Sequence, residues 1–268
     1  MSPEDKFVRV YKFVLAGLLI GWFIKLPAFF WKYFNVVIFD YPIHYEFFPT
    51  MFDAPFTARM FYLLPILTVV GFTLKFEKWH LTVYKVIAGI FLISSIVMML
   101  HLASYNDATF VTSFWVSLWL LWFCFHRGDD EHKHAINLAL ILVSVTFLGG
   151  FIGKCTGDWW NGEAFFGIMQ SFFTHYPFEW IKNNFTFEQL SLISKYMSWC
   201  IIFIEFALAT SFLWPRKHTL RFVPLIILGI VFFRTWKILS VVSSLAALLW
   251  ACLYLLPEKT EELEEETV

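Results

Sequence analysis

A series of apolar runs, most of them about as long as a membrane helix, constrains this chain most strongly. A helix needs about 20 residues to cross the hydrocarbon core of a bilayer. Hydrophobic residues make up 59% of the 268 positions, whereas a soluble domain has roughly half. The alternation of a β-barrel is missing from these runs. We therefore predict an all-α, polytopic membrane bundle with about eight membrane-embedded segments. The predicted helices lie near residues 11–31, 58–74, 81–102, 108–125, 135–154, 196–214, 219–233 and 238–256.

Residues 1–257 are predicted to form a single transmembrane domain, and the acidic residues 258–268 a disordered tail. Two long aromatic connections, near residues 32–59 and 155–195, should lie on the same side of the bundle. Within the second, residues 161–173 mix apolar side chains with few charges, which indicates a half-buried or re-entrant helix. Gly149 and Gly153 form a small-xxx-small pair, so we expect another helix to approach them closely.

The distribution of basic residues predicts the orientation of the bundle. With a cytoplasmic amino terminus, twelve Lys and Arg residues near the helix ends face the cytoplasm and seven face the opposite side. Both termini are therefore predicted to be cytoplasmic, in a bacterial inner membrane or an ER-type membrane. Both aromatic connections then lie on the outer side.

The segment Gly149 to Glu163, GGFIGKCTGDWWNGE, combines features that are ordinary when they occur singly. Lys154 ends an apolar run, where a lysine can extend its charge to the membrane surface. Trp159 and Trp160 are typical of a membrane interface. Their combination with Asp158 in one turn indicates a functional site on the outer side.

The spacing of these residues resembles a known family. Lys154, then Trp159 five positions later and Gly162 three positions further on, follow a helix that carries Gly150 and Gly153. This pattern resembles the vitamin K-dependent gamma-carboxylases and the wider horizontally transferred transmembrane (HTTM) proteins. A similar pattern occurs in lipase maturation factors. The resemblance extends loosely from Val8 to Pro257.

The resemblance implies a function on the outer side of the membrane. It implies that Lys154 is a general base acting on a reduced, vitamin K-like quinone, in quinol-dependent carboxylase or oxygenase-like lyase chemistry. The carboxylases also have a large lumenal portion and an Asn-His turn, whereas this sequence ends at Val268 and has Tyr105-Asn106-Asp107. Gamma-carboxylation of proteins is therefore not expected.

Glu205 is the acidic residue deepest within an apolar run. An unpaired carboxylate there costs at least about 2.5 kcal/mol, so we expect a cationic partner among Lys154, Arg234 and Lys237. The pair with Lys154 has two interpretations: a structural clamp between helices, or an acid that holds the lysine ready for proton transfer. These roles compete, because lysine is a base near neutral pH only if its pKa falls by several units.

These observations lead to a site hypothesis with open alternatives. We expect an outward-facing pocket for a small hydrophobic ligand, a quinol or a lipid, with aromatic walls. The alternative is a non-catalytic scaffold or maturation subunit that binds a membrane or extracytoplasmic partner protein. A small transporter is less favoured, because no inverted repeat is visible. No metal-binding motif and no nucleic-acid partner are predicted, and membrane lipids are expected neighbours. The predicted catalytic residues are Lys154 and Glu205, the predicted ligand-binding residues are Asp158, Trp159, Trp160, Gly162 and His175, and Phe165 and Phe166 are further wall residues.

Overall fold

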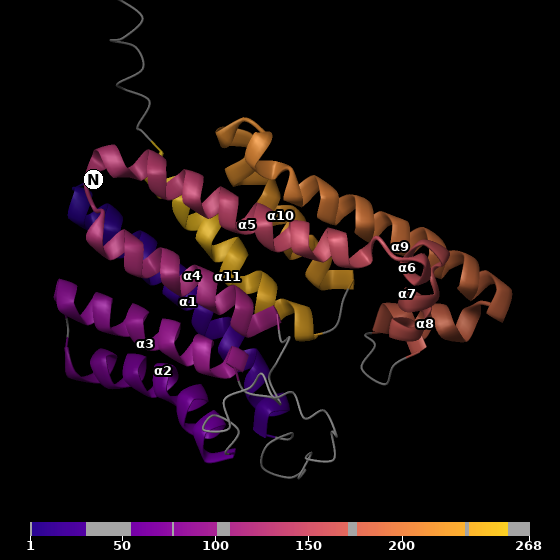
Figure 1. Ribbon diagram of the computed structural model, residues 1–268, viewed down its shortest axis with the longest axis horizontal. Helices are drawn as coiled ribbons and strands as arrows, with labels where there is room; N and C mark the ends of the chain where they lie inside the picture. The colour runs from indigo at the N-terminus through magenta and orange to yellow at the C-terminus, as the bar shows by residue number, and fades with distance from the viewer. Residues whose placement is uncertain are drawn as a thin grey trace, which may run out of the picture.

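The computed structural model describes residues 2–30, 55–76, 78–100, 108–170, 176–233 and 236–256, which form helices joined by turns (Figure 1). No strand occurs in this part of the chain, so the predicted all-α class is confirmed. Three short helices, α6 (Gly157–Asn161), α7 (Glu163–Gln170) and α8 (Tyr176–Asn184), lie between α5 and α9 in the chain. The long helices are α1 (Pro3–Phe30), α2 (Pro55–Lys75), α3 (Leu81–Leu100), α4 (Ala108–Phe125), α5 (His132–Lys154), α9 (Phe187–Ala209), α10 (Arg216–Phe233) and α11 (Trp236–Cys252).

Each of the predicted helix positions is occupied by a helix. Within the described residues, five helices are long and apolar enough to cross a membrane, as expected of an integral membrane protein. The total of about eight embedded segments stays a prediction. The five are Pro3–Leu26, Leu81–Leu100, Ala108–Phe125, His132–Lys154 and Phe187–Ala209.

Two helices begin earlier than predicted because of local capping. In α9, Thr186 and Gln189 form a capping box: the Gln189 amide donates to Thr186 Oγ1 and the Thr186 amide donates to Gln189 Oε1. The helix therefore begins at Phe187 rather than near 196. The α1 helix begins at Pro3 rather than near 11, because Ser2 Oγ accepts a hydrogen bond from the Asp5 amide.

The first and last long helices, α1 and α11, pack closely through glycine. A Cβ atom on Gly17 would lie 2.8 Å from the Ser243 carbonyl oxygen, and one on Gly21 would lie 2.5 Å from the Ser240 carbonyl oxygen. Only glycine permits this approach. The expectation for Gly149 and Gly153 is wrong, since no described atom beyond the adjacent backbone of α5 lies within 4 Å of a Cβ at either position. The close contact uses Gly17 and Gly21 instead.

Two hydrogen bonds between buried polar side chains join helices in the centre of the bundle. The Trp22 indole Nε1 donates to Ser113 Oγ at 2.9 Å and so joins α1 to α4. Thr109 and Ser240 share a hydrogen bond of 2.7 Å between α4 and α11. Such bonds satisfy polar atoms that have no access to water in a membrane.

Cations gather over aromatic rings at the end of the bundle that carries the amino terminus. Lys12 Nζ lies 5.8 Å from the Trp79 ring centroid, and Lys85 Nζ lies 4.0 Å from that of Phe125. This is the end predicted to be cytoplasmic, and the orientation itself stays a prediction.

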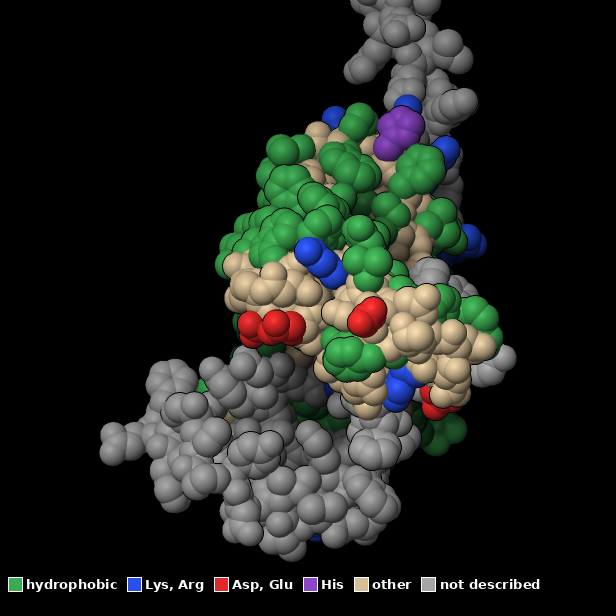
Figure 2. All heavy atoms as spheres, turned by 90° about the vertical axis from the view of Figure 1, so that its right-hand side faces the viewer, with side chains coloured by type: hydrophobic (Ala, Val, Ile, Leu, Met, Phe, Trp, Pro, Cys, Tyr) green, Lys and Arg blue, Asp and Glu red, His purple; other side chains and the backbone are tan. Residues whose placement is uncertain are grey.

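Helices α6, α7 and α8 lie at the opposite end (Figure 1). Hydrophobic side chains there share the surface with charged side chains of both signs (Figure 2), a mixture typical of a membrane interface. The helix expected within residues 161–173 is present as α7, which buries Phe165 and Met169. Its depth in a membrane stays a prediction.

Candidate functional site

Helices α5 and α9 run antiparallel, and this places Lys154 beside Glu205. Ser144 and Ser211 share a hydrogen bond of 3.3 Å near one end of the contact. The Phe151 and Phe206 rings lie 5.1 Å apart further along. Residues later in α5 therefore lie beside residues earlier in α9. Lys154, the last residue of α5, lies beside Glu205 of α9.

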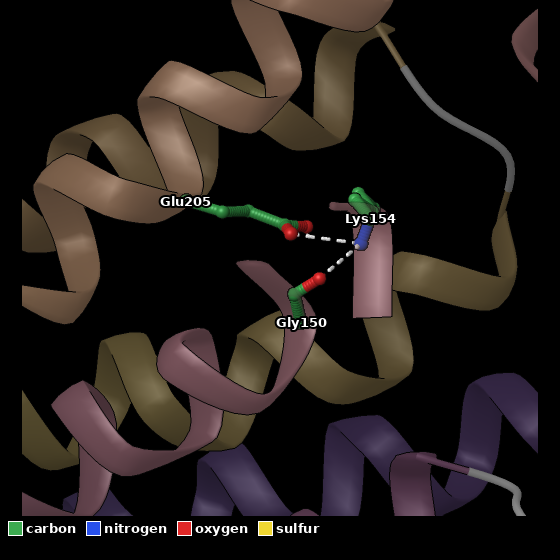
Figure 3. Close-up of polar contacts among 3 residues, drawn as sticks. All are labelled: Gly150, Lys154 and Glu205. Carbon is green, nitrogen blue, oxygen red and sulfur yellow. Dashed lines mark hydrogen bonds and ion pairs between the residues drawn. The ribbon is translucent and has the colours of Figure 1, made fainter. Parts of the chain in front are cut away.

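The predicted ion pair is present. Lys154 Nζ lies 2.8 Å from Glu205 Oε2 and also donates to the Gly150 carbonyl oxygen at 3.3 Å (Figure 3). The Lys154 and Glu205 side chains are only 15% and 11% exposed. The other two expected partners, Arg234 and Lys237, have side chains outside the described part of the chain.

Gly150 is a residue of the site that the sequence reasoning did not assign. A Cβ at this position would lie 3.0 Å from Glu205 Oε2 and 3.3 Å from its Cδ. The missing side chain therefore gives the carboxylate its place against the α5 backbone. The sequence contains a signal for this position: Gly150 is one helical turn before Lys154, and residues four apart lie on the same face of a helix.

Trp159 reaches the pair from α6. Its ring centroid lies 5.2 Å from Lys154 Nζ, within the range of a cation–π interaction. Trp159 also packs with Phe166 against the buried Phe165, Met169 and Leu190. Three of the four rings expected to wall the site thus lie in one cluster.

The remaining predicted ligand-binding residues occupy different positions. Trp160 is 40% exposed, and its carbonyl oxygen accepts a hydrogen bond from Trp199 Nε1 at 2.9 Å. Asp158 is exposed in the first turn of α6. His175 lies outside the described residues.

Gly162 has a backbone role that accounts for its position. Its φ is +85°, in the left-handed region that favours glycine. A Cβ atom there would lie 2.6 Å from both the Lys195 nitrogen and its Cα. Gly162 therefore holds the end of α6 against α9, which positions Trp159 near the ion pair.

The pair leaves hydrogen-bonding capacity unused. A lysine ammonium has three donors and a carboxylate two acceptor oxygens. In the described part of the chain, Lys154 makes two hydrogen bonds and Glu205 accepts only at Oε2. One N–H donor and the Oε1 acceptor therefore lie together in a largely buried place beside an indole ring.

Comparison with known proteins adds no assignment: no family model, no curated protein and no solved structure matches this chain. The described residues also contain no group of three or more His, Cys, Asp or Glu side chains placed to hold a metal ion.

Proposed function

We propose that this integral membrane protein binds a small hydrophobic molecule with a polar oxygen-containing head, a quinol or a lipid, at Lys154, Glu205 and Trp159. The observation that carries the proposal is the partly satisfied ion pair. Lys154 Nζ is 2.8 Å from Glu205 Oε2, and among the described residues one Lys154 donor and the Glu205 Oε1 acceptor have no partner.

A neutral hydroxyl group complements this arrangement. It accepts a hydrogen bond from the unused Lys154 donor and donates one to Glu205 Oε1, so both of these atoms gain a partner. An apolar ring or chain attached to the hydroxyl finds the Trp159 indole and the cluster around Phe165, because aromatic rings stack well on flat apolar groups. An anionic head is less suitable, because the paired Glu205 carboxylate repels it.

Catalysis is a further step of the same proposal. The resemblance to the vitamin K-dependent carboxylases implies that Lys154 is a general base. A base needs a free electron pair on its amine, whereas the Lys154 amine is occupied by its contact with Glu205 Oε2 at 2.8 Å. Base catalysis therefore requires that the ligand separates Lys154 from Glu205, or that Glu205 takes up a proton.

The alternative is a non-catalytic scaffold or maturation subunit that binds a partner protein. The observation that favours it is that the same ion pair connects α5 to α9, and that both groups are largely buried. In that function, the pair holds the two helices in register so that the outer end presents one surface.

Mass spectrometry of the extracted protein distinguishes the two functions. We expect wild-type protein to retain a quinone or a particular lipid, and Lys154→Met to lose it while it remains folded. Lys195→Met is the matched control, because Lys195 is a half-buried lysine at the same end whose ammonium lies over the Trp199 ring. It should retain the molecule.

The opposite pattern supports the scaffold. If Lys154→Met unfolds the protein, or if wild type and Lys154→Met carry the same molecules in the same amounts, the binding proposal fails.

A further inference from the structure

The corner that joins α9 to α10 lies beside the middle of α5 (Figure 1). In this corner, the Ser211 hydroxyl shares its hydrogen bond of 3.3 Å with Ser144 of α5. At about 1.5 Å per residue, Ser144 lies about 18 Å from the start of α5 and about 15 Å from its end. The corner is therefore level with the middle of a helix that is long and apolar enough to cross a membrane.

Thr219 fixes the first turns of α10 at this level. Its hydroxyl is 0% exposed and lies 3.1–3.2 Å from three carbonyl oxygens of the corner, those of Ser211, Trp214 and Pro215. The side chains that follow Pro215 therefore begin at the depth of the corner, and they cannot move away from it without breaking these contacts.

Basic and apolar side chains lie together on the surface of the corner. The basic side chains are all exposed, and the apolar ones are at least half exposed. The His218 ring stacks on the Phe222 ring, with 5.9 Å between the two centroids, and so joins the two kinds of side chain. We call this surface the basic corner patch; it consists of Phe212, Leu213, Arg216, Lys217, His218, Arg221, Phe222 and Leu225.

The neighbouring helices supply no acid to balance these charges. Helices α5 and α11 contain no Asp or Glu. In α9, Glu188 lies in the first turn, far from the corner, and Glu205 is paired with Lys154. Among the described residues, the side chains of Arg216 and Arg221 make no ion pair and no hydrogen bond.

Other cations of the bundle differ from these two arginines. Lys12 and Lys85 each lie over an aromatic ring, which partly compensates their charge. An arginine at membrane depth is costly unless it pairs with an anion or extends to the headgroups. The guanidinium group also matches the geometry of a phosphate, which it can bind with two hydrogen bonds.

We infer that the basic corner patch binds an anionic phospholipid. The phosphate pairs with Arg216 and Arg221, and the acyl chains cover the exposed side chains of Phe212 and Leu213. A lipid with a zwitterionic headgroup fits less well, because its ammonium group is repelled by the same arginines. This binding surface is separate from the Lys154 site and does not depend on the proposed function.

The test measures apparent Kd values by native mass spectrometry of the delipidated full chain in detergent. Dioleoylphosphatidylglycerol is the anionic probe. Dioleoylphosphatidylcholine has the same chains without net charge, and glycerol 3-phosphate has the anion without the chains. We expect wild type to bind phosphatidylglycerol at least about tenfold more tightly than either of the others. Equal binding of the two lipids overturns the inference. Binding of glycerol 3-phosphate as tight as that of phosphatidylglycerol shows a site for a free anion and also overturns it.

Two double variants test the role of the arginines. Arg216→Gln with Arg221→Gln should raise the Kd of phosphatidylglycerol about twentyfold, which is the effect of two cations lost near a lipid phosphate. Arg216→Lys with Arg221→Lys keeps both charges and should remain within about threefold of wild type. A loss as large in the lysine variant as in the glutamine variant would contradict the role of charge.

The matched control removes two exposed lysines from the connection between α2 and α3. Lys75→Gln with Lys78→Gln should change the Kd by less than about twofold, because charges beyond a Debye length are screened. A loss equal to that of the arginine variant would mean that the charge of the whole surface attracts the lipid, and the inference would be wrong. Lys154→Met should bind phosphatidylglycerol as wild type does, because the ion pair lies outside the patch.

A final measurement separates binding from folding. Without lipid, the Tm of the glutamine variant should equal that of wild type, because both arginine side chains are exposed. If the double variant unfolds, the single variants Arg216→Gln and Arg221→Gln decide the question, and each should raise the Kd about fivefold. Unchanged binding in both single variants would overturn the inference.

Discussion

Gly150 and Glu205 meet so closely that a Cβ atom at position 150 would lie 3.0 Å from the carboxylate oxygen Oε2. The same glycine offers its carbonyl oxygen to Lys154 at 3.3 Å. The backbone of α5 thus positions both members of the ion pair. A side chain introduced at position 150 would therefore displace the ion pair without removing either charge.

Gly150→Ala is predicted to displace the Glu205 carboxylate and to lower Tm. Alanine normally stabilises a helix relative to glycine by up to about 1 kcal/mol. A lower Tm would therefore show that the clash with Glu205 outweighs the helix propensity of alanine. Gly149→Ala and Gly153→Ala are matched controls, because no described atom lies within 4 Å of a Cβ at either position. Thermal unfolding in detergent measures all three. Equal stability of the three variants would contradict the close contact.

The Lys154–Glu205 pair is predicted to show coupling in a double-mutant cycle. Lys154→Met and Glu205→Gln each leave one largely buried group without its partner, and we expect each to destabilise the protein by about 1–3 kcal/mol. The double variant should lose less than the sum of the two, by about 1 kcal/mol or more. Unfolding free energies of the four proteins test this. Additive losses would mean that the two groups do not stabilise each other.

Gly162→Ala is predicted to loosen the contact between α6 and α9. The left-handed backbone costs a non-glycine residue about 1–2 kcal/mol, and the new Cβ would lie 2.6 Å from the Lys195 backbone. Hydrogen exchange should therefore increase at the end of α6 and around Lys195. Gly157→Ala, at a position with no described atom within 4 Å of its Cβ, is the control and should leave exchange unchanged.

Gly21→Ala is predicted to disrupt the packing of α1 against α11. The added methyl group would lie 2.5 Å from the Ser240 carbonyl oxygen, a backbone atom that cannot move aside cheaply. We expect a clear loss of folded protein in detergent, measured by size-exclusion chromatography. Gly89→Ala in α3, where no described atom lies within 4 Å of the Cβ, should fold as wild type does. If both variants fold equally well, this close packing is not needed for folding.

The apolar runs determined the fold class and the positions of the long helices, because a membrane helix satisfies its own backbone hydrogen bonds and needs only sufficient apolar length. The composition of Glu205's surroundings was also enough to predict a cationic partner, since a charge in an apolar run cannot remain unpaired. Helices α1 and α9 begin earlier than the apolar runs predict, because Ser2 and the Thr186–Gln189 capping box extend them into polar sequence.

Only the tertiary structure decided which partner Glu205 takes and which glycines contact other helices. Gly149, Gly150 and Gly153 are equivalent in the sequence, yet only Gly150 faces the carboxylate. That choice depends on the rotation of α5 about its axis, which is set by its packing against α9 over many side chains. Gly17 and Gly21 likewise lie at a close helix contact only because α11 packs against α1. The residues specify which groups need partners, and the packing of helices distant in sequence selects the partner.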